Sequence, residues 1–142
     1  DRGRKGVVTR EDIEGFLDRL AAEGASGGHS EIEPGLWVVK PTGSLDVDVV
    51  VNYSPPVVIL RVKVMNVPAN GPAAAKLTRR LLELNATDLV HGAYGLERES
   101  IVLSEALELA HLDYAEFQSA YEGMTLALAA HLKELATYRD AG

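Results

Sequence analysis

"LDYAEFQSAYEGMTLALAAHL", residues 112–132, decides the fold, because it predicts a long helix with one continuous apolar stripe. Asp113 and Glu116 have the spacing of a capping box, so the helix is expected to begin there. A helix from Asp113 to about Arg139 would be roughly 40 Å long, whereas a five-stranded sheet is only about 19–20 Å wide. A helix that crosses the sheet directly would overhang it, and that overhang suggests a partner subunit, whereas a helix that lies diagonally across the sheet need not overhang. The residues of the apolar stripe recur every three or four positions: Phe117, Tyr121, Met124, Leu128, Leu132 and Leu135.

Upstream of this helix, the sequence predicts a β-hairpin with one valine-rich face. The stretches LDVDVVV (45–51) and VILRVKV (58–64) both alternate between two faces, and NYSPP lies between them. We expect the valine-rich face to pack on Met124, Leu128 and their neighbours. One face of the sheet would then pack on the long helix, and the opposite face would either be exposed or be covered by another element.

The expected hairpin register depends on where the turn closes. If residues 53–56 form the turn, Asp48 lies opposite Arg61 and Asp46 lies opposite Lys63. The same register aligns the two valine-rich faces, and a slip of one residue would lose both features. The two aspartates are therefore interpreted as partners of basic residues across the strands, with a metal-binding carboxylate pair as the alternative.

The other face of the hairpin carries apolar residues beside these charges. Val50, Val57, Ile59 and Met65 are the candidates for a protein-binding face, because an extended client could lie on an exposed sheet. The alternative is that the chain's own first helix covers these four residues.

The remaining segments complete an α+β order of helix, three antiparallel strands, helix, two strands and long C-terminal helix. Thr9 and Asp12 form a capping-box pattern before a first helix that Gly24 would end. The glycine- and serine-rich residues 24–30 favour a loop. The first strand is LWVVK, the second helix spans 70–85 with Pro72 near its start, and two short strands flank an ERES turn. One domain is expected over residues 8–140, after a flexible segment at 1–7.

Composition narrows the classes of partner and compartment. The chain has 142 residues, no cysteine, 14 basic and 21 acidic side chains, and a net charge of −7. The absence of cysteine excludes disulfides and thiolate metal sites and fits a reducing cytoplasm. Direct nucleic-acid binding is not expected because acidic residues dominate, although Arg2, Arg4, Lys5 and Arg10 form a basic cluster at the start. No apolar run approaches the roughly 20 residues of a membrane span.

No motif for catalysis or for a cofactor is visible. The histidines at 29, 91, 111 and 131 lack a second ligand at the spacings that build a local metal site, although ligands from distant segments could still meet. Phosphate loops, dinucleotide fingerprints and nucleophile elbows are also missing. We therefore expect no enzyme, no cofactor and no metal.

The order of elements resembles the YbjN family of bacterial proteins, whose fold is similar to the type III secretion chaperones. The resemblance extends over roughly Val8 to Leu135, and it is strongest in "HGAYGLERESIVLSEALELAHLDYAEFQSAYEGMTLALAAHL" (91–132). There a glycine-containing strand, an IVL strand and a capped helix follow in close succession. YbjN-like proteins are described as sensory transduction regulators, whereas the secretion chaperones are dimers that hold extended client segments.

The resemblance implies a non-catalytic adaptor or chaperone-like regulator that acts as a homodimer and binds a client protein. One alternative is a small-molecule or signal-binding regulatory module. Another is an enzyme whose site is assembled from distant residues, which is the least favoured because no nucleophile, base or ligand set is visible.

Overall fold

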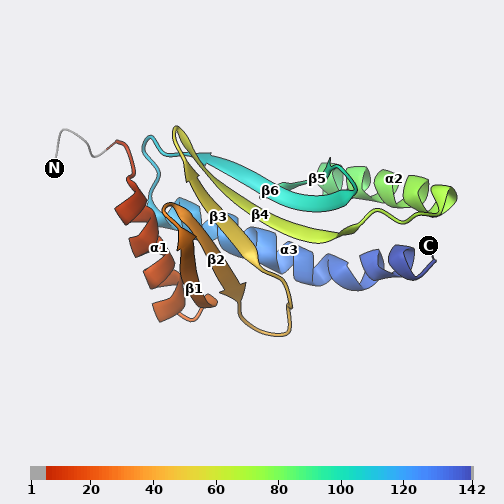
Figure 1. Cartoon of the computed structure of the whole chain (residues 1–142), viewed down its shortest axis with the longest axis horizontal. Helices are drawn as coiled ribbons and strands as arrows, with labels where there is room; N and C mark the ends of the chain where they lie inside the picture. The colour runs from red at the N-terminus through yellow and green to blue at the C-terminus, as the bar shows by residue number, and fades with distance from the viewer. Residues whose placement is uncertain (1–5, 142) are drawn as a thin grey trace.

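The computed structural model describes residues 6–141, which form three helices and a six-stranded antiparallel sheet (Figure 1). The strands lie side by side in the order β1-β2-β3-β4-β6-β5. Figure 1 views the sheet from its helix-free side, with α3 running behind the strands. The elements are α1 (Arg10–Ala22), β1 (Ser26–Glu33), β2 (Leu36–Pro41), β3 (Val49–Ser54), β4 (Val57–Asn66), α2 (Gly71–Thr87), β5 (Ala93–Glu97), β6 (Ser100–Glu108) and α3 (Tyr114–Ala141).

The helices begin where their capping residues predict. The Thr9 and Asp12 side chains exchange hydrogen bonds with each other's backbone amides, which completes the capping box of α1. The Asp113 carboxylate accepts from the Glu116 amide at 2.8 Å at the start of α3. Asn70 caps α2, which ends at Thr87 rather than at the expected Asn85. Caps satisfy backbone amides that have no partner inside the helix, so the three starts are set locally.

The expected α+β class is confirmed, but four strands rather than three precede α2. Residues 24–30 were expected to form a loop, whereas β1 begins at Ser26 and pairs with β2. The positive φ of Gly28 lies in a register shift between Ser26 and His29. Such a bulge lets a glycine-rich segment complete the sheet beside an apolar strand. Local composition favours a loop here, and pairing with β2 overrides it.

The β3–β4 hairpin has a register two residues away from the expected one. Ser54 pairs with Val57 across the turn, so Val50, rather than Asp48, lies opposite Arg61. Asp46 and Asp48 precede β3 and take no part in its ladder. The expected charge pairs are therefore wrong. A shift of two residues keeps every side chain on its expected face, so the alignment of the valine-rich faces survives.

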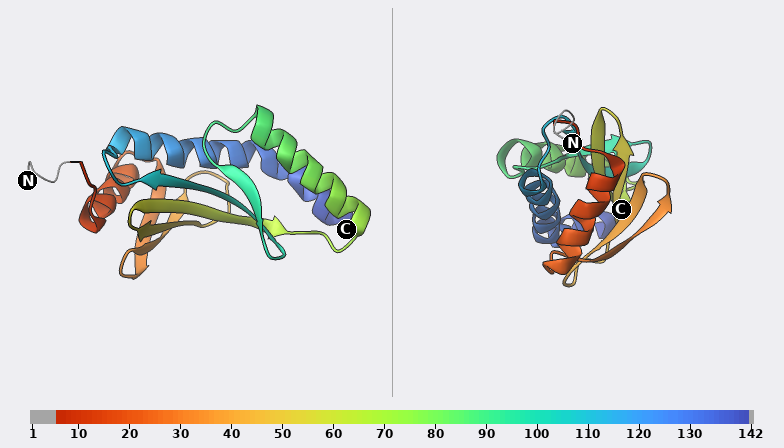
Figure 2. Two further views of the ribbon diagram at one scale, coloured as in Figure 1. Left: turned by 90° about the horizontal axis from the view of Figure 1, so that it is seen from above. Right: turned by 90° about the vertical axis from the view of Figure 1, so that its left-hand side faces the viewer.

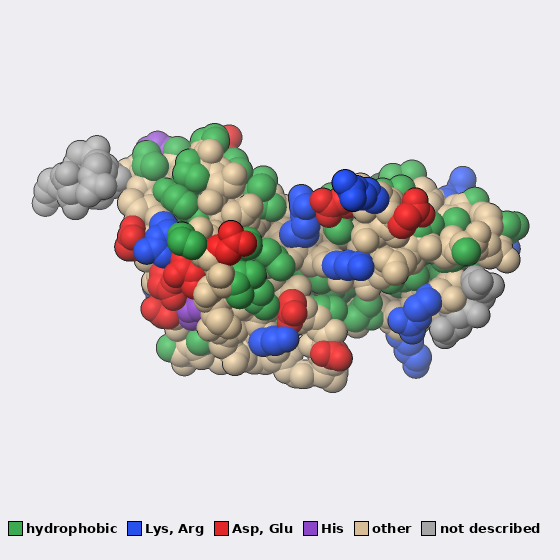
Figure 3. Space-filling view, in the orientation of Figure 1, with side chains coloured by type: hydrophobic (Ala, Val, Ile, Leu, Met, Phe, Trp, Pro, Cys, Tyr) green, Lys and Arg blue, Asp and Glu red, His purple; other side chains and the backbone are tan. Residues whose placement is uncertain are grey.

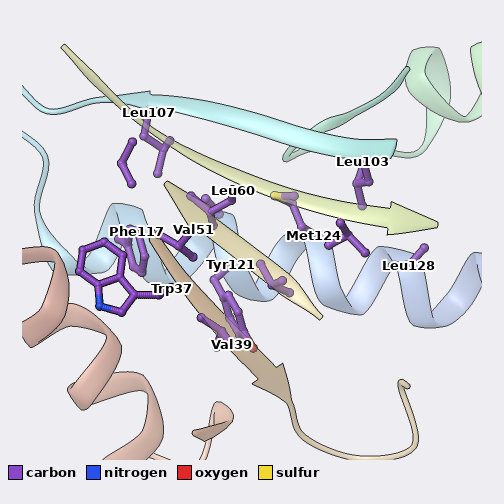
Figure 4. Packing of buried hydrophobic residues seen from close by; sticks show 14 of the residues in the cluster. Trp37, Val39, Val51, Leu60, Leu103, Leu107, Phe117, Tyr121, Met124 and Leu128 are labelled. Carbon is purple, nitrogen blue, oxygen red and sulfur yellow. The ribbon is translucent and has the colours of Figure 1, made fainter. Parts of the chain in front are cut away.

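The hydrophobic core lies between one face of the sheet and the helices. Val49, Val51, Val58, Leu60 and Val62 are at most 1% exposed. They belong to one cluster with Phe117, Met124 and Leu128 of α3, and Figure 4 shows Val51 and Leu60 facing that helix. The predicted packing of the valine-rich face on the long helix is thus confirmed. We refer to this side of the sheet as the inner face.

Helix α3 lies beside other helices of the same chain at both of its ends, as the two views of Figure 2 show. Near its start, Phe117 packs on Phe16 of α1 with ring centroids 5.5 Å apart. Near its end, Glu134 accepts two hydrogen bonds from Arg80 of α2, at 2.6 and 3.2 Å. The helix therefore runs along the long strands and carries α1 and α2 on its two ends. Its length is no reason to expect a second subunit.

The N-terminal segment is described from Gly6 onward. Val7 forms a β-bridge with Ala110, and the Val8 amide donates to the Leu109 carbonyl at 3.0 Å. Three members of the basic cluster, Arg2, Arg4 and Lys5, lie outside the described residues. The fourth, Arg10, donates hydrogen bonds to Glu31 and Glu11. This arginine therefore serves as a tie between α1 and β1.

Candidate functional site

The candidate site is the helix-free side of the sheet, which we call the outer face. Val50, Val57 and Ile59 alternate with core residues along β3 and β4, so their side chains point away from the helices and are half-buried. The pairings Val38 with Val50, Leu36 with Asn52, and Ile59 with Ala106 add residues from two further strands. The exposed and half-buried apolar residues of the outer face are thus Leu36, Val38, Val50, Val57, Ile59 and Ala106. Val102, opposite Lys63, lies on the same face but is buried.

Met65 does not belong to the outer face, contrary to its sequence-based placement. A register shift between Lys63 and Met65 changes the side to which the following residues point. Met65 therefore pairs with Ile101, is 8% exposed and joins the hydrophobic core. The strict alternation that placed Met65 beside Ile59 fails at this bulge.

The first helix does not cover the outer face. Ile13, Leu17 and Leu20 of α1 are fully buried in the same cluster as Trp37 of the inner face. Helix α1 also packs on α3 through Phe16. Both helices therefore lie on one side of the sheet, and the alternative in which α1 shields Val50 and Ile59 is wrong.

Two hollows lie beside the apolar residues of the outer face. The first, which we call the strand hollow, has a volume of about 120 Å³ and is lined by Leu36, Val50, Asn52, Ile59 and Arg61. The second, the hairpin-tip hollow, has a volume of about 330 Å³ and is lined mainly by Tyr53, Pro55, Pro56, Val57 and Leu109. Val57 and Ile59 are alternate residues of β4, so the hollows follow one another along that strand. Both are apolar with a few polar groups, as recognition sites commonly are.

Charged side chains surround these hollows in an uneven way. Figure 3 shows hydrophobic side chains over the left and centre of this face, with an acidic cluster at the left, and lysine and arginine side chains with some acidic ones among them over its right half. Arg61 donates to Glu97 at 3.1 Å, and Lys40 donates to Asp48. The hydrogen bond to Asp48 raises the pKa of Lys40 above its usual range.

Two polar groups of β4 are left available on this face. Lys63 is exposed and makes no ion pair within residues 6–141. The Arg61 Nε–H is buried and donates no hydrogen bond to any group in that part of the chain. A buried donor without a partner is costly, so a ligand that offered an acceptor there would gain from it.

A second polar cluster joins α1 to β1. His29 Nε2 lies 3.1 Å from a Glu14 carboxylate oxygen and 3.2 Å from one of Asp18. Trp37 Nε1 donates to the other Glu14 oxygen at 2.7 Å. The sequence places Glu14 and Asp18 one helical turn apart but gives no sign that His29 lies over them, because the loop expected at 24–30 is a strand. These three side chains could hold a divalent cation, and as they stand they tie β1 to α1.

A third polar group lies beneath the C-terminal half of α3. The Tyr94 hydroxyl and His131 Nδ1 are 2.7 Å apart, and His131 Nε2 lies 2.5 Å from an Asp88 carboxylate oxygen. His131 is buried, as expected for the edge of the apolar stripe. Burial raises the pKa of Tyr94 above its ordinary value. The group joins α3, β5 and the end of α2, and it opens into none of the hollows of the outer face.

The edge strand β5 is also tied down by a side chain. Asn85 of α2 donates to the Tyr94 carbonyl at 3.0 Å and accepts from the Tyr94 amide at 2.8 Å. These bonds occupy the groups through which an edge residue could pair with another strand. Because these backbone groups of β5 are occupied, the outer face rather than this edge is the exposed surface of the sheet.

Comparisons with known proteins define the class of protein. The fold is that of the type III secretion chaperones. A chain of the ExoU–SpcU complex from the type III secretion system of Pseudomonas aeruginosa superposes with a TM-score of 0.64 at 15% identity, over 87% of this chain and 96% of that chain. A chain of the HopA1–SchA chaperone–effector complex gives a TM-score of 0.56 at 11% identity, over 90% and 93%.

The resemblance to YbjN is also confirmed. YbjN from E. coli superposes with a TM-score of 0.61 at 13% identity, over 90% of this chain and 96% of that chain. The family model CesT_Tir_1 matches residues 8–141, and the chain belongs to this family of type III secretion chaperones, which are not enzymes. No curated protein sequence matches the chain. None of the helices in residues 6–141 is long and apolar enough to cross a membrane.

Proposed function

We propose that the protein is a chaperone-like adaptor that binds a segment of another protein on the outer face. The observation that carries this proposal is an apolar sheet surface, centred on Val50 and Ile59, that none of the described helices covers. Membership of a chaperone family supports it, as does the occurrence of similar folds in chaperone–effector complexes. The cysteine-free composition is compatible with action in the cytoplasm.

The test compares charged substitutions on the two sides of the molecule. The tagged chain and its Val50→Glu and Ile59→Glu variants are expressed in the host, and co-purifying proteins are identified. Leu126→Glu is the matched control, because Leu126 is an exposed apolar residue on α3. A carboxylate on the apolar surface would be desolvated by a bound client, so both outer-face variants should lose the captured protein.

The same experiment needs a check on folding and has a clear contrary result. All variants should show the circular dichroism and thermal transition of the parent chain, because the substituted side chains lie outside the fully buried core. Retention of the captured protein by both Val50→Glu and Ile59→Glu would exclude the outer face as the binding surface.

The adaptor is further proposed to act as a homodimer. Exposed apolar side chains on α2, β5 and the loop between them support this, namely Leu82, Val90 and Leu96. Light scattering during gel filtration over a range of concentrations should give a mass near twice 15.3 kDa. A mass of 15.3 kDa at every concentration would mean that the adaptor works as a monomer.

A regulatory module that binds a small molecule is the second candidate. The hairpin-tip hollow, at about 330 Å³, favours it because ligand pockets begin at roughly this volume. A ligand held there should raise the melting temperature in proportion to its occupancy. A broad metabolite screen that yields no stabilising compound would count against this function.

A further inference from the structure

We infer that the outer face selects an extended client segment whose alternate side chains are apolar, apolar, acidic and acidic. The segment would lie along β4, and the inference rests on the proposed function. It is carried by the side chains that β4 presents on this face, in the order Val57, Ile59, Arg61 and Lys63. The strand surface is therefore apolar in one half and basic in the other.

The backbone of β4 cannot hold the client. This strand lies between β3 and β6, so its amides and carbonyls are used in the two ladders. A client on the face must therefore be recognised through side chains. Alternate residues of an extended chain are roughly 6.6–6.8 Å apart. Strand β4 is itself an extended chain, so its alternate residues have the same spacing. Side chains at positions 1 and 3 of the client can thus meet Val57 and Ile59 while those at 5 and 7 reach the basic half.

The two hollows set the apolar part of this pattern. Val57 lines the hairpin-tip hollow and Ile59 lines the strand hollow, so successive apolar side chains of the client have separate places to enter. The strand hollow has a volume of only about 120 Å³, which favours a single aliphatic side chain over an aromatic one.

The charges set the acidic part. Arg61 has a buried Nε–H without an acceptor in residues 6–141, and Lys63 has no ion-pair partner there. A carboxylate beside Arg61 would supply the missing acceptor, and one beside Lys63 would find an unpaired cation. The chain as a whole carries a charge of −7 and Arg61 is already paired with Glu97, so an acidic client is attracted by the unpaired Lys63 and by the open Nε–H donor of Arg61 rather than by the net charge.

The test uses a defined peptide in place of the unknown client. The probe is fluorescein-labelled Ser-Leu-Ser-Leu-Ser-Glu-Ser-Glu-Ser, and the control is Ser-Leu-Ser-Glu-Ser-Leu-Ser-Glu-Ser, which has the same composition in another order. Binding to the full chain is followed by fluorescence polarisation. We expect the probe to bind roughly tenfold more tightly than the control, a difference of about 1.4 kcal/mol.

Reversing the charge of Lys63 tests whether the basic half of β4 binds the acidic residues of the client. Lys63→Glu should weaken binding of the probe several-fold and strengthen binding of a version in which both Glu residues are Lys. Lys76→Glu on the exposed side of α2 makes the same change in net charge away from the site and should leave both affinities unchanged. Neither lysine makes an ion pair within residues 6–141, so both variants should fold.

The contrary results separate this inference from the proposed function. Equal binding of the two peptide orders, equal effects of Lys63→Glu and Lys76→Glu, or no peptide binding at all would overturn the inference. If Ile59→Glu still abolished client capture in that case, the outer face would remain the binding surface but without this pattern. If Ile59→Glu left both capture and peptide binding intact, both proposals would fail.

Discussion

The inner and outer faces of the sheet are made by neighbouring residues of the same strands, yet only the inner face is covered. On β4, Leu60 is fully buried beneath α3, whereas Ile59 is half-buried and points away from all three described helices. The core cluster of the inner face is hydrophobic and includes Trp37 beside its aliphatic residues, whereas the outer face mixes aliphatic residues with Arg61 and Lys63. Burial of the inner face stabilises the fold, and the outer face is the surface proposed for recognition.

The largest expected effect is the difference in stability between substitutions of two adjacent residues of β4. Leu60→Ala should lower the free energy of unfolding by about 2–5 kcal/mol, because it leaves a cavity in a closely packed core. Ile59→Ala should lower it by about 1 kcal/mol, because only part of that side chain leaves water on folding. Urea denaturation of the two variants measures the difference. Equal losses would mean that the outer face is also a core, covered in solution by another subunit.

The second prediction concerns the stability that the buried tyrosines contribute at alkaline pH. Burial raises the pKa of the Tyr114 and Tyr121 hydroxyls to about 12, and it also raises the pKa of Tyr94. Because the folded-state pKa lies above the unfolded value of about 10, the contribution to stability is complete below pH 10. It is lost as the pH rises from 10 through about 12.

Thermal denaturation between pH 8 and 12 checks this prediction. The melting temperature should fall above pH 10 together with the appearance of tyrosinate absorbance at the unfolding transition. In a Tyr53→Phe/Tyr138→Phe background, which keeps Tyr94, Tyr114 and Tyr121, tyrosinate absorbance at pH 10 in the folded protein would contradict the burial of these hydroxyls.

How much of this organisation the sequence predicts depends on whether the signal is local. The starts of α1 and α3 are predictable because capping residues act within one turn, and the faces of Val58, Leu60 and Val62 follow from strict alternation. These signals placed Val50, Val57 and Ile59 correctly on the outer face. They were sufficient for most of the candidate site.

The features that were missed depend on distant contacts. Strand β1 forms although it contains Gly27 and Gly28, because β2 offers it an open edge and α1 holds His29. Met65 was misplaced because a bulge cannot be read from alternation alone. The adjacent Val64 and Met65, both apolar, were the signal that the alternation ends there.

A third difference lies between two buried tyrosines, one in β5 and the other in α3. Tyr94→Phe should lower the free energy of unfolding by about 0.5–1.5 kcal/mol, because its hydroxyl hydrogen-bonds with His131. The Tyr121 hydroxyl is buried and has no hydrogen-bond partner in residues 6–141. Tyr121→Phe should therefore leave stability unchanged or raise it, because the desolvation cost of that hydroxyl is removed. A loss for Tyr121→Phe as large as that for Tyr94→Phe would show that the Tyr121 hydroxyl is bonded in solution.

The smallest expected effect is that of the ion pair between Lys40 and Asp48 beside the outer face. Both side chains are about half exposed or more, so water and salt screen their attraction and the ordering of two side chains opposes it. Lys40→Ala should thus change the urea midpoint less than any substitution above, and the double variant with Asp48→Ala should show little coupling between them. Such a result would assign the charges of the outer face to recognition rather than to folding. A coupling as large as the loss for Leu60→Ala would mean that the border of the outer face stabilises the fold and that the two faces differ less than their burial indicates.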